Sequence, residues 1–459
     1  MALNALDRHI ALIGFMGAGK STLYELVAAE LDRWGIDVDH DASEVIRERG
    51  IDEFRSLEEL RTINELLVER PGVLALGGGA ILSDGVRTTL ADRAFTVLLG
   101  VDADTAWGRV GGSDRPLAQD EADFRRLFEE RAPLYQEAAD AVATDADGVI
   151  LAAAGVHHEF GAIGRLGDLV PGEGPVALVA DATVLGIHGD TAKVALGDRL
   201  QSVHELPTGE PAKQIAVVER LWSELRLDRG GTIVALGGGA ATDTAGFAAA
   251  TYLRGVPWVV VPTSLVGQVD ASIGGKTAID TAQGKNLVGA FHWPARVVID
   301  EALLETLPER ERRQGEAERI KTELLAGRDL DVRATAAYKS ALCLRDPHDR
   351  GPRQWLNLGH TFAHALEAAA DFDLPHGEAV ALGLLAALRL SGRDTARVEE
   401  ALDPQPVRVD RERAWAALQR DKKFTGGQFN LVLLDDDGPV VEARPADEVR
   451  DALDSLIAS

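Results

Sequence analysis

The most restrictive feature of the sequence is a glycine-rich turn near its start, Gly14-Phe-Met-Gly-Ala-Gly19-Lys20-Ser21. An apolar segment, HIALI at 9–13, comes directly before this turn, and a segment of helical pattern, STLYELVAAELDRW, overlaps its end. Between a strand and a helix, the pattern G-x-x-x-x-G-K-[ST] lets backbone N–H groups face phosphate oxygens, with the hydroxyl placed to bind Mg²⁺. A chance glycine turn is the alternative, but the flanking elements are those that a phosphate loop requires. The turn therefore predicts an ATP site with Ser21 as a Mg²⁺ ligand, formed by Gly14, Gly17, Gly19, Lys20, Ser21 and Thr22.

Strands alternate with helices over about two thirds of the chain. Apolar strand candidates lie at 9–13, 73–82, 95–101, 176–181, 203–210, 231–239 and 256–264, and helical patterns dominate after about 300. Such alternation predicts the α/β class, with parallel sheets covered by helices on both faces. A Gly-rich segment that contains Pro, GAIGRLGDLVPGEGPVALVADATV, separates the two parts of the chain, and we place the boundary near 150–165. We expect a phosphate-loop domain of three layers at 1–150, a second α/β domain at 151–300 and a helical domain at 301–459.

Composition excludes several classes of partner. The 459 residues include 48 basic and 74 acidic ones, a formal charge of −26 that repels nucleic acid and anionic membrane surfaces. One cysteine, Cys343, precludes an intramolecular disulfide framework. Neither a secretion signal nor an apolar stretch of about 18 residues is apparent, so we expect a cytoplasmic protein. Only nine of the basic residues are lysines, so each lysine draws attention to a local function.

Three arginines, together with a run of glycines at the end of a strand, suggest a site for the phosphoryl acceptor in the first domain. Arg55 lies in FRSLE, Arg115 in DRPLA and Arg131 in ERAPLY, and Gly77-Gly78-Gly79 follows a strand. Each arginine alone would be interpreted as a solvated helix charge. Together with the phosphate loop, they resemble a shikimate kinase over about residues 9–145. The resemblance implies Arg115 in a lid over ATP, Asp39 near Mg²⁺, and a shikimate site formed by Asp41, Arg55, Gly78, Gly79 and Arg131.

Two departures from this family pattern leave an alternative open. The carboxylates Asp37, Asp39 and Asp41 can be aligned in more than one register, of which we favour Asp39 and Asp41. The segment between Asp41 and Arg55 is shorter than in the family. The alternative is a degenerate nucleotide-binding or scaffolding module without kinase activity.

Histidines in the last third of the chain suggest a metal site. His360 and His364 are spaced to share one face of a helix, His376 follows, and Glu318 precedes them. Imidazole nitrogens with one carboxylate are ligands for Zn²⁺. The H-x-x-x-H pair by itself would be better explained by two core or surface histidines.

A succession of motifs over residues 163–459 is similar to 3-dehydroquinate synthase. The motifs include ALGGGAATD, VPTSLVGQVDASIGGKTA, GKNLVGAFHWP, AERIK, RQWLNLGHTFAHALE, HGEAVALG and RDKKFTGG, in this order. The resemblance implies that Glu318, His360 and His376 bind Zn²⁺ or Co²⁺. It implies a catalytic and substrate-binding set of Arg254, Asp270, Lys276, Lys321, Lys339, Arg353, Asn357, His364 and Lys422. It implies NAD binding by Asp181, Glu210, Lys213, Gly238, Gly239, Asp243, Thr263, Ser264, Lys285, Asn286 and Thr306.

The two resemblances together imply a fused enzyme of the shikimate pathway. It would convert 3-deoxy-arabino-heptulosonate 7-phosphate to 3-dehydroquinate and phosphate, phosphorylate shikimate with ATP, and act on small anionic substrates as a homodimer through the synthase part. Another sugar-phosphate cyclase or a polyol dehydrogenase is the alternative. The cations Lys339 and Arg353, with Asn357, favour a substrate that bears a carboxylate. The segment between Glu318 and His360 is shorter than usual.

Overall fold

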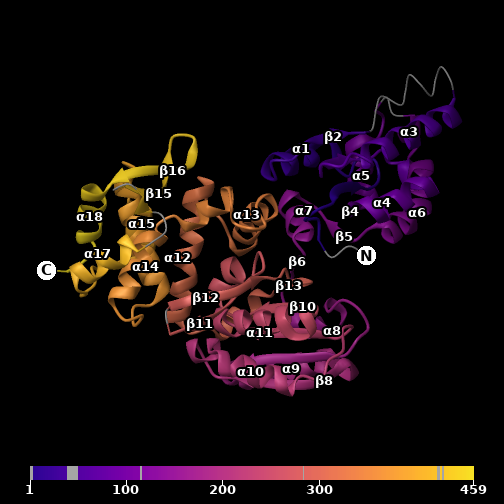
Figure 1. Cartoon of the computed structure of the whole chain (residues 1–459). Helices are drawn as coiled ribbons and strands as arrows, with labels where there is room; N and C mark the ends of the chain where they lie inside the picture. The colour runs from indigo at the N-terminus through magenta and orange to yellow at the C-terminus, as the bar shows by residue number, and fades with distance from the viewer. Residues whose placement is uncertain are drawn as a thin grey trace. The chain divides into compact units, whose positions relative to one another are not determined.

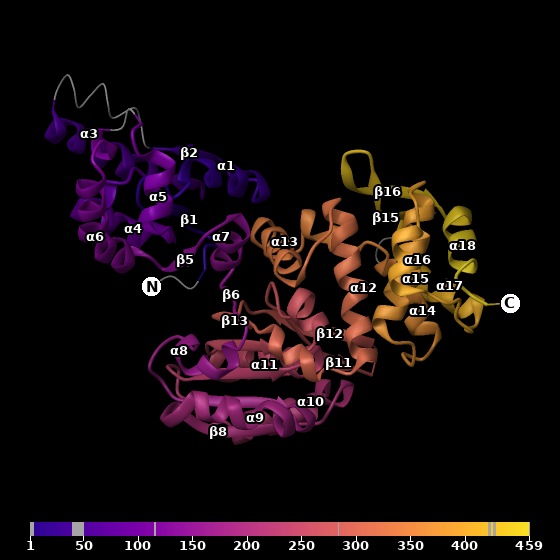
Figure 2. The same cartoon turned by 180° about the vertical axis from the view of Figure 1, so that it is seen from behind.

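The computed structural model describes residues 4–38, 50–113, 116–282, 284–420, 424–425 and 428–458. The chain forms two compact units, Met1–His157 and His158–Ser459 (Figures 1 and 2). Both contain parallel sheets with helices on their faces, which confirms the predicted α/β class. The described helices include none that is both long and apolar enough to span a bilayer.

The first unit is built on a five-stranded parallel sheet of order β2-β3-β1-β4-β5. Every residue of the central strand β1 is buried, which explains why HIALI is apolar apart from His9, whose ring nitrogens are hydrogen-bonded to Val68 and Gly72. In sheet order the strands are Gly35–Asp37, Val73–Ala75, His9–Ile13, Ala94–Leu99 and Ala141–Ala143. The helices are α1 Lys20–Glu30, α3 Ile51–Leu66, α4 Asp84–Arg93, α5 Ala103–Val110, α6 Glu121–Ala138 and α7 Ala146–Ala153.

The second unit is built on a six-stranded sheet of order β6-β13-β10-β9-β7-β8, in which the edge strand β6 spans the boundary between the two units. In sheet order the strands are Val156–His158, Arg296–Ile299, Trp258–Pro262, Thr232–Gly237, Val176–Asp181 and Leu200–Leu206. Helices α8 Leu166–Leu169, α9 Ala182–Leu196, α10 Ile215–Glu224 and α11 Gly239–Thr251 accompany it. Because β7, β9 and β10 are parallel neighbours, their carboxyl ends meet at one edge of the sheet. An antiparallel hairpin, β11 Lys276–Thr281 and β12 Gly284–Phe291, follows.

The remainder of the second unit is a helical layer around its own core. Phe362, Leu384 and Phe429 lie in this core, and each is almost fully buried. The helices are α12 Glu309–Ala326, α13 Val332–Arg345, α14 His360–Ala369, α15 His376–Leu390, α16 Ala396–Leu402, α17 Arg411–Gln419 and α18 Ala446–Asp454.

A three-stranded antiparallel sheet, β14 Phe424–Thr425, β15 Gln428–Asp435 and β16 Gly438–Pro445, lies among these helices. Helices dominate after residue 300, as predicted, and this small sheet was not among the predicted elements. The apolar residues of β15 pack into the helical core, so this strand behaves as one wall of that core rather than as a separate domain.

Candidate functional site

The glycine-rich turn of the first unit forms a loop between β1 and α1. Gly17 has a φ of 84°, and a Cβ placed on it would lie 2.8 Å from the carbonyl oxygen of Ala106, so only glycine fits. Gly19 has a φ of 93° and directly precedes Lys20, the first residue of α1. The buried Lys20 ammonium donates to the carbonyl oxygens of Gly14 at 2.9 Å and Phe15 at 3.3 Å. Ser21 and Thr22 are exposed in the first helical turn. The loop therefore has the form that a nucleotide phosphate requires.

The structure brings together four of the predicted acceptor residues. The Arg131 guanidinium, from α6, donates to the carbonyl oxygen of Gly78 at 2.9 Å. The Arg55 guanidinium, from α3, lies against Gly79 in the space that a Cβ would fill. Burial lowers the pKa of Arg131, and the charge of Arg55 lowers it further. Two guanidinium groups held this close together favour a site for an anion.

Two further residues support this cluster and were not predicted from the sequence. Glu58 is buried and accepts from Arg55 at 2.5 Å. The Tyr135 hydroxyl donates to the Gly78 carbonyl at 2.5 Å, and burial raises the pKa of Tyr135 to about 12. The motif ERAPLY contains the signal for Tyr135, because Tyr135 lies one helical turn after Arg131 and therefore on the same face of α6. The predicted residues Asp39, Asp41, Arg115 and Lys422 lie outside the described residues.

The predicted metal ligands meet in the second unit. Glu318 from α12, His360 at the start of α14 and His376 at the start of α15 have potential ligand atoms within 4.8 Å of one another. Glu318 Oε1 lies 3.3 Å from His360 Nε2 and 3.0 Å from His376 Nε2. Two imidazoles and one carboxylate converging from three helices fit a catalytic Zn²⁺ site, in which a fourth position stays open for substrate.

Buried charges connect this cluster to Asp270. The Lys321 ammonium contacts Glu318 and lies 3.9 Å from Asp270 Oδ1. The Lys339 ammonium donates to Asp270 Oδ1 at 2.5 Å. Burial opposes ionisation of Glu318 and Asp270, but the neighbouring lysines outweigh it, so the pKa of each carboxyl is lowered. Burial lowers the pKa of Lys339, whereas Glu318 and Asp270 raise that of Lys321 despite its burial.

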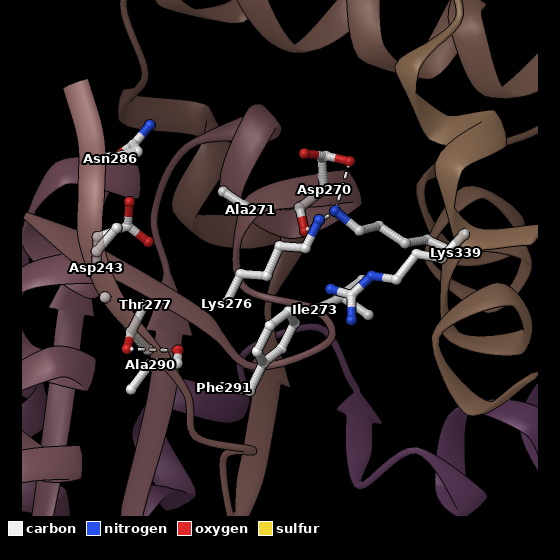
Figure 3. A pocket seen from close by; sticks show the side chains of 13 residues that line it. Asp243, Asp270, Ala271, Ile273, Lys276, Thr277, Asn286, Ala290, Phe291 and Lys339 are labelled. Atoms are coloured by element: carbon white, nitrogen blue, oxygen red, sulfur yellow. Dashed lines mark hydrogen bonds and ion pairs between the residues drawn. The ribbon is translucent and has the colours of Figure 1, made fainter. Parts of the chain in front are cut away.

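A cavity of about 450 Å³ opens beside this network. Its lining includes five residues of the predicted catalytic and cofactor sets that carry charge, Asp243, Asp270, Lys276, Lys339 and Arg353. Figure 3 shows the ammonium groups of Lys276 and Lys339 both reaching toward Asp270. The cations come from β11, α13 and the 3₁₀ helix Pro352–Asn357, and they converge on a single space.

Neighbouring groups fix two of these cations. The buried Arg353 guanidinium donates to the carbonyl oxygens of Gly274 at 3.0 Å and Pro347 at 3.2 Å. Lys276 pairs with Asp349 Oδ2 at 2.5 Å. Asp349 was not predicted from the sequence, because an aspartate in a short polar loop, DPHDRG, has no distinguishing pattern.

Three other predicted catalytic residues, Asn357, His364 and Arg254, are not part of the cavity lining. Asn357 ends the 3₁₀ helix that carries Arg353. The His364 ring lies 5.5 Å from the His360 ring, on the same helix. Arg254 is exposed and has a φ of 69°, in a turn after α11.

Five of the eleven predicted cofactor residues lie at the carboxyl edge of the six-stranded sheet. Asp181 ends β7 and accepts from the backbone of Thr183 and Val184 at the start of α9. Gly238 and Gly239 follow β9, and Thr263 and Ser264 follow β10. Ligands of open α/β sheets bind at this edge. Thr306 lies after β13 and pairs with His188 at 2.9 Å.

A second group of the predicted cofactor residues forms a polar network that includes Asp243 of α11. Lys213 donates to Asp243 at 2.7 Å and to the side-chain oxygen of Asn286, and Lys285 pairs with Glu210 at 3.1 Å. Burial raises the pKa of Asp243 to about 6, although Lys213 opposes this.

Comparison with known families agrees with this geometry. Residues 203–314 match the N-terminal model of 3-dehydroquinate synthase, and residues 296–424 match its C-terminal model. A 3-dehydroquinate synthase from Rhodospirillum rubrum is 40% identical over 328 residues, which are 61% of this chain and 85% of that protein. The chain belongs to the 3-dehydroquinate synthase family. Another 3-dehydroquinate synthase, from Symbiobacterium thermophilum, is 37% identical over 355 residues, 69% of this chain and 94% of that protein.

The synthase is fused to a shikimate kinase domain, because residues 16–154 match the shikimate kinase model. Among solved structures, the synthase part is similar to 2-epi-5-epi-valiolone synthase from Streptomyces hygroscopicus subsp. jinggangensis 5008, with NAD⁺ and Zn²⁺ bound. The TM-score is 0.56 at 25% identity, over 66% of this chain and 96% of that chain. A 2-deoxy-scyllo-inosose synthase shares the fold, with a TM-score of 0.57 at 22% identity over 65% of this chain and 96% of that chain.

Proposed function

We propose that the second unit converts 3-deoxy-arabino-heptulosonate 7-phosphate to 3-dehydroquinate and phosphate, with NAD and Zn²⁺ or Co²⁺. The first unit transfers a phosphoryl group from ATP, with Mg²⁺, to shikimate. The synthase activity is supported mainly by one observation. Three cations, Lys276, Lys339 and Arg353, line one cavity that a buried charge network joins to the cluster of Glu318, His360 and His376.

The donor sets fit the two cofactors of the synthase. Glu318, His360 and His376 provide one oxygen and two nitrogens, a set suited to Zn²⁺ or Co²⁺. The residues at the ends of β7, β9 and β10 provide the sheet edge where a dinucleotide binds. When bound, NAD takes up and returns a hydride, and the metal ion polarises the oxygen at the carbon that loses it.

The charged residues of the cavity account for substrate binding. A substrate with one carboxylate and one phosphate carries several negative charges, and in a chain of charge −26 these need local cations. Lys276, Lys339 and Arg353 provide three. Asp270 holds the Lys339 ammonium at 2.5 Å, and the backbone contacts of Arg353 fix its guanidinium before substrate arrives. Such preorganisation reduces the entropy lost on binding.

In the first unit, the phosphate loop and the arginine cluster have separate tasks. Lys20 and the backbone of the loop hold the nucleotide phosphates. Arg55 and Arg131 bind the carboxylate of shikimate, since guanidinium groups pair with carboxylates in bidentate geometry. We further expect a homodimer through the second unit, an expectation that rests on the family resemblance alone.

Two assays on the purified chain test this proposal. The heptulosonate phosphate is supplied with NAD⁺ and Zn²⁺ or Co²⁺, and release of phosphate and formation of dehydroquinate are both measured. Shikimate, ATP and Mg²⁺ are supplied separately, and ADP is measured. We expect stoichiometric phosphate and dehydroquinate in the first assay and shikimate-dependent ADP in the second.

A matched pair of lysine variants serves as the internal control. Lys339→Met removes a buried cation from the cavity, and Lys193→Met removes a partly exposed lysine of α9 that pairs with Asp190 at 3.0 Å. Only the first should abolish dehydroquinate formation. Phosphate release without dehydroquinate, or turnover of a neutral sugar phosphate instead, would contradict the synthase assignment. Absence of shikimate-dependent ADP would identify the first unit as a nucleotide-binding module.

A further inference from the structure

Glu367 is a buried carboxylate to which neither the sequence nor the proposed chemistry gives a role. It lies on α14, the helix that begins at His360, and only 9% of its surface is exposed. Its Oε1 lies 3.1 Å from Nδ1 of His376, whose other ring nitrogen, Nε2, lies 3.0 Å from Oε1 of Glu318. The His376 ring therefore bridges two carboxylates, one inside the predicted metal cluster and one outside it.

The two histidines of the cluster are held differently on their outer side. His360 Nδ1 lies 3.2 Å from the carbonyl oxygen of Leu358, a backbone acceptor close to it in the chain. His376 has the carboxylate of Glu367 instead. A proton on Nδ1 of either ring leaves the lone pair of Nε2 directed at the cluster, as a metal ligand requires. The acceptor on the outer side thus fixes both the tautomer and the orientation of the ring.

The backbone around His376 gives the ring less support than that of His360. His376 follows the loop after α14, in which Asp371 and Phe372 have φ values of 52° and 64°. Left-handed backbone at a bulky residue such as phenylalanine is strained. The His376 side chain is 39% exposed, against 12% for His360. A side chain that is this exposed and that follows a strained loop depends on its hydrogen bonds for its orientation.

The charge balance around the cluster is a second reason to connect Glu367 with metal binding. Glu318 is the only anion inside the cluster, and the Lys321 ammonium contacts it directly. Lys321 also lies 3.9 Å from Asp270, which pairs with Lys339, so the two carboxylates and two ammonium groups are together neutral, and this is unfavourable for a divalent cation. The carboxylate of Glu367, which lies on the far side of the His376 ring, restores net negative charge next to the cluster.

We propose that Glu367 is a positioning residue of the metal centre. It orients His376 for coordination, and it supplies negative charge in place of that of Glu318, which Lys321 cancels. This inference rests on the metal site of the proposed function. It concerns how tightly that site holds the ion rather than which reaction follows.

Metal affinity of the apoprotein, measured by competition with a chromogenic chelator for Zn²⁺ and for Co²⁺, tests the proposal without any turnover. Glu367→Gln keeps the size and an acceptor oxygen but removes the charge, and Glu367→Ala removes both. We expect the dissociation constants to rise by about 10- to 100-fold, the usual effect of losing such a partner, and more for Ala than for Gln. The visible spectrum of bound Co²⁺ should also change, because the ligand field depends on the orientation of His376.

Glu378→Gln is the matched control, since Glu378 lies exposed in the first turn of α15 and its loss changes the charge of the chain equally. We expect its metal affinity to stay within about twofold of the unsubstituted chain. Unfolding of the apoproteins in urea shows whether the variants fold, and Glu367→Gln should match the unsubstituted chain.

Three outcomes would overturn the proposal. They are unchanged affinity in both Glu367 variants, an equal loss in Glu367→Gln and Glu378→Gln, and no metal binding by the unsubstituted chain. If affinity depends on Glu367 but no dehydroquinate is formed, the proposed function fails and the role of Glu367 stands.

Discussion

Gly78 and Gly79 are neighbours at the acceptor site of the first unit, yet their surroundings differ. A Cβ on Gly78 would meet Met16 N at 3.7 Å, an ordinary contact, whereas a Cβ on Gly79 would overlap the Arg55 guanidinium. Gly79 has a φ of −105°, so its backbone would accept a side chain. The restriction at Gly79 therefore comes from the arginine and not from the backbone.

This difference makes the two glycines a matched test of the acceptor site. Gly79→Ala should displace Arg55 and raise the KM for shikimate by about tenfold or more, because a hydrogen bond to a charged group contributes about 1.5–3 kcal/mol. The KM for ATP should stay within about twofold. Steady-state kinetics with each substrate varied in turn measure both constants. Gly78→Ala should raise the shikimate KM less than Gly79→Ala does, because its Cβ would make only ordinary contacts and leave Arg55 in place, and an equal rise in the two variants would contradict the role given to Arg55.

At the residue scale, rare residue types and motifs predicted several residues that the structure brings together. Lys20, Lys339 and the ligands His360 and His376 were identified in this way, and the structure places them in clusters. Glu58, Asp349 and Glu367 were missed because acidic residues are abundant in a chain with 74 of them. Only folding shows which acidic side chains face a cation or an imidazole.

The packing of α14 against α15 is the element contact that positions the metal ligands. Gly359 has a φ of 76° and directly precedes His360, and its Cβ would lie 2.8 Å from the backbone of Gly383 in α15. A Cβ on Gly383 would overlap the carbonyl oxygen of Gly359. Two glycines thus let the N-terminus of one helix approach the middle of the other.

Gly383→Ala should therefore separate these helices. We expect it to lower the free energy of unfolding by about 1–3 kcal/mol, as overpacking does, and to weaken Zn²⁺ binding because His360 begins α14. Urea unfolding and chelator competition measure the two effects. Gly186→Ala in α9, where nothing lies within 4 Å of the added Cβ, should instead stabilise by about 0.5–1 kcal/mol. Equal stability of the two variants would show that the close contact is unimportant.

At the element scale, apolar runs predicted the parallel strands because both faces of these sheets are buried. The run VALVAD corresponds residue for residue to β7, and HIALI to β1. The antiparallel strands β14, β15 and β16 were missed. β15 alternates buried and exposed residues over only part of its length, and its partner β16 has no buried residue, so neither shows a clear strand pattern.

Considered as a whole, the molecule consists of two units, each with its own sheet and its own candidate site. The phosphate loop and arginine cluster lie within Met1–His157, and the metal cluster and cavity lie within His158–Ser459. The described part of each site uses no residue of the other unit. We therefore expect that each of the two activities can be abolished by substitution without loss of the other.

Single substitutions should show this independence. Lys20→Met should abolish shikimate-dependent ADP formation and leave dehydroquinate formation within about twofold, because it removes only the cation of the phosphate loop. His360→Ala should do the reverse, because it removes a metal ligand. Both activities are measured on the same preparation of each variant. A loss of both activities in either variant would show that the sites depend on each other.

The scarcity and burial of lysine have a practical consequence for covalent chemistry. Of the seven lysines that the structure describes, Lys20, Lys213, Lys321 and Lys339 are buried. Lys276 and Lys193 have the most exposed side chains, at 50% and 40%, and Lys285 follows at 33%. Among these, an acylating reagent would react mainly at Lys193, which is not a candidate site residue, and at Lys276, on the wall of the cavity. Attachment of the enzyme to an amine-reactive support would therefore compete directly with occupation of the cavity.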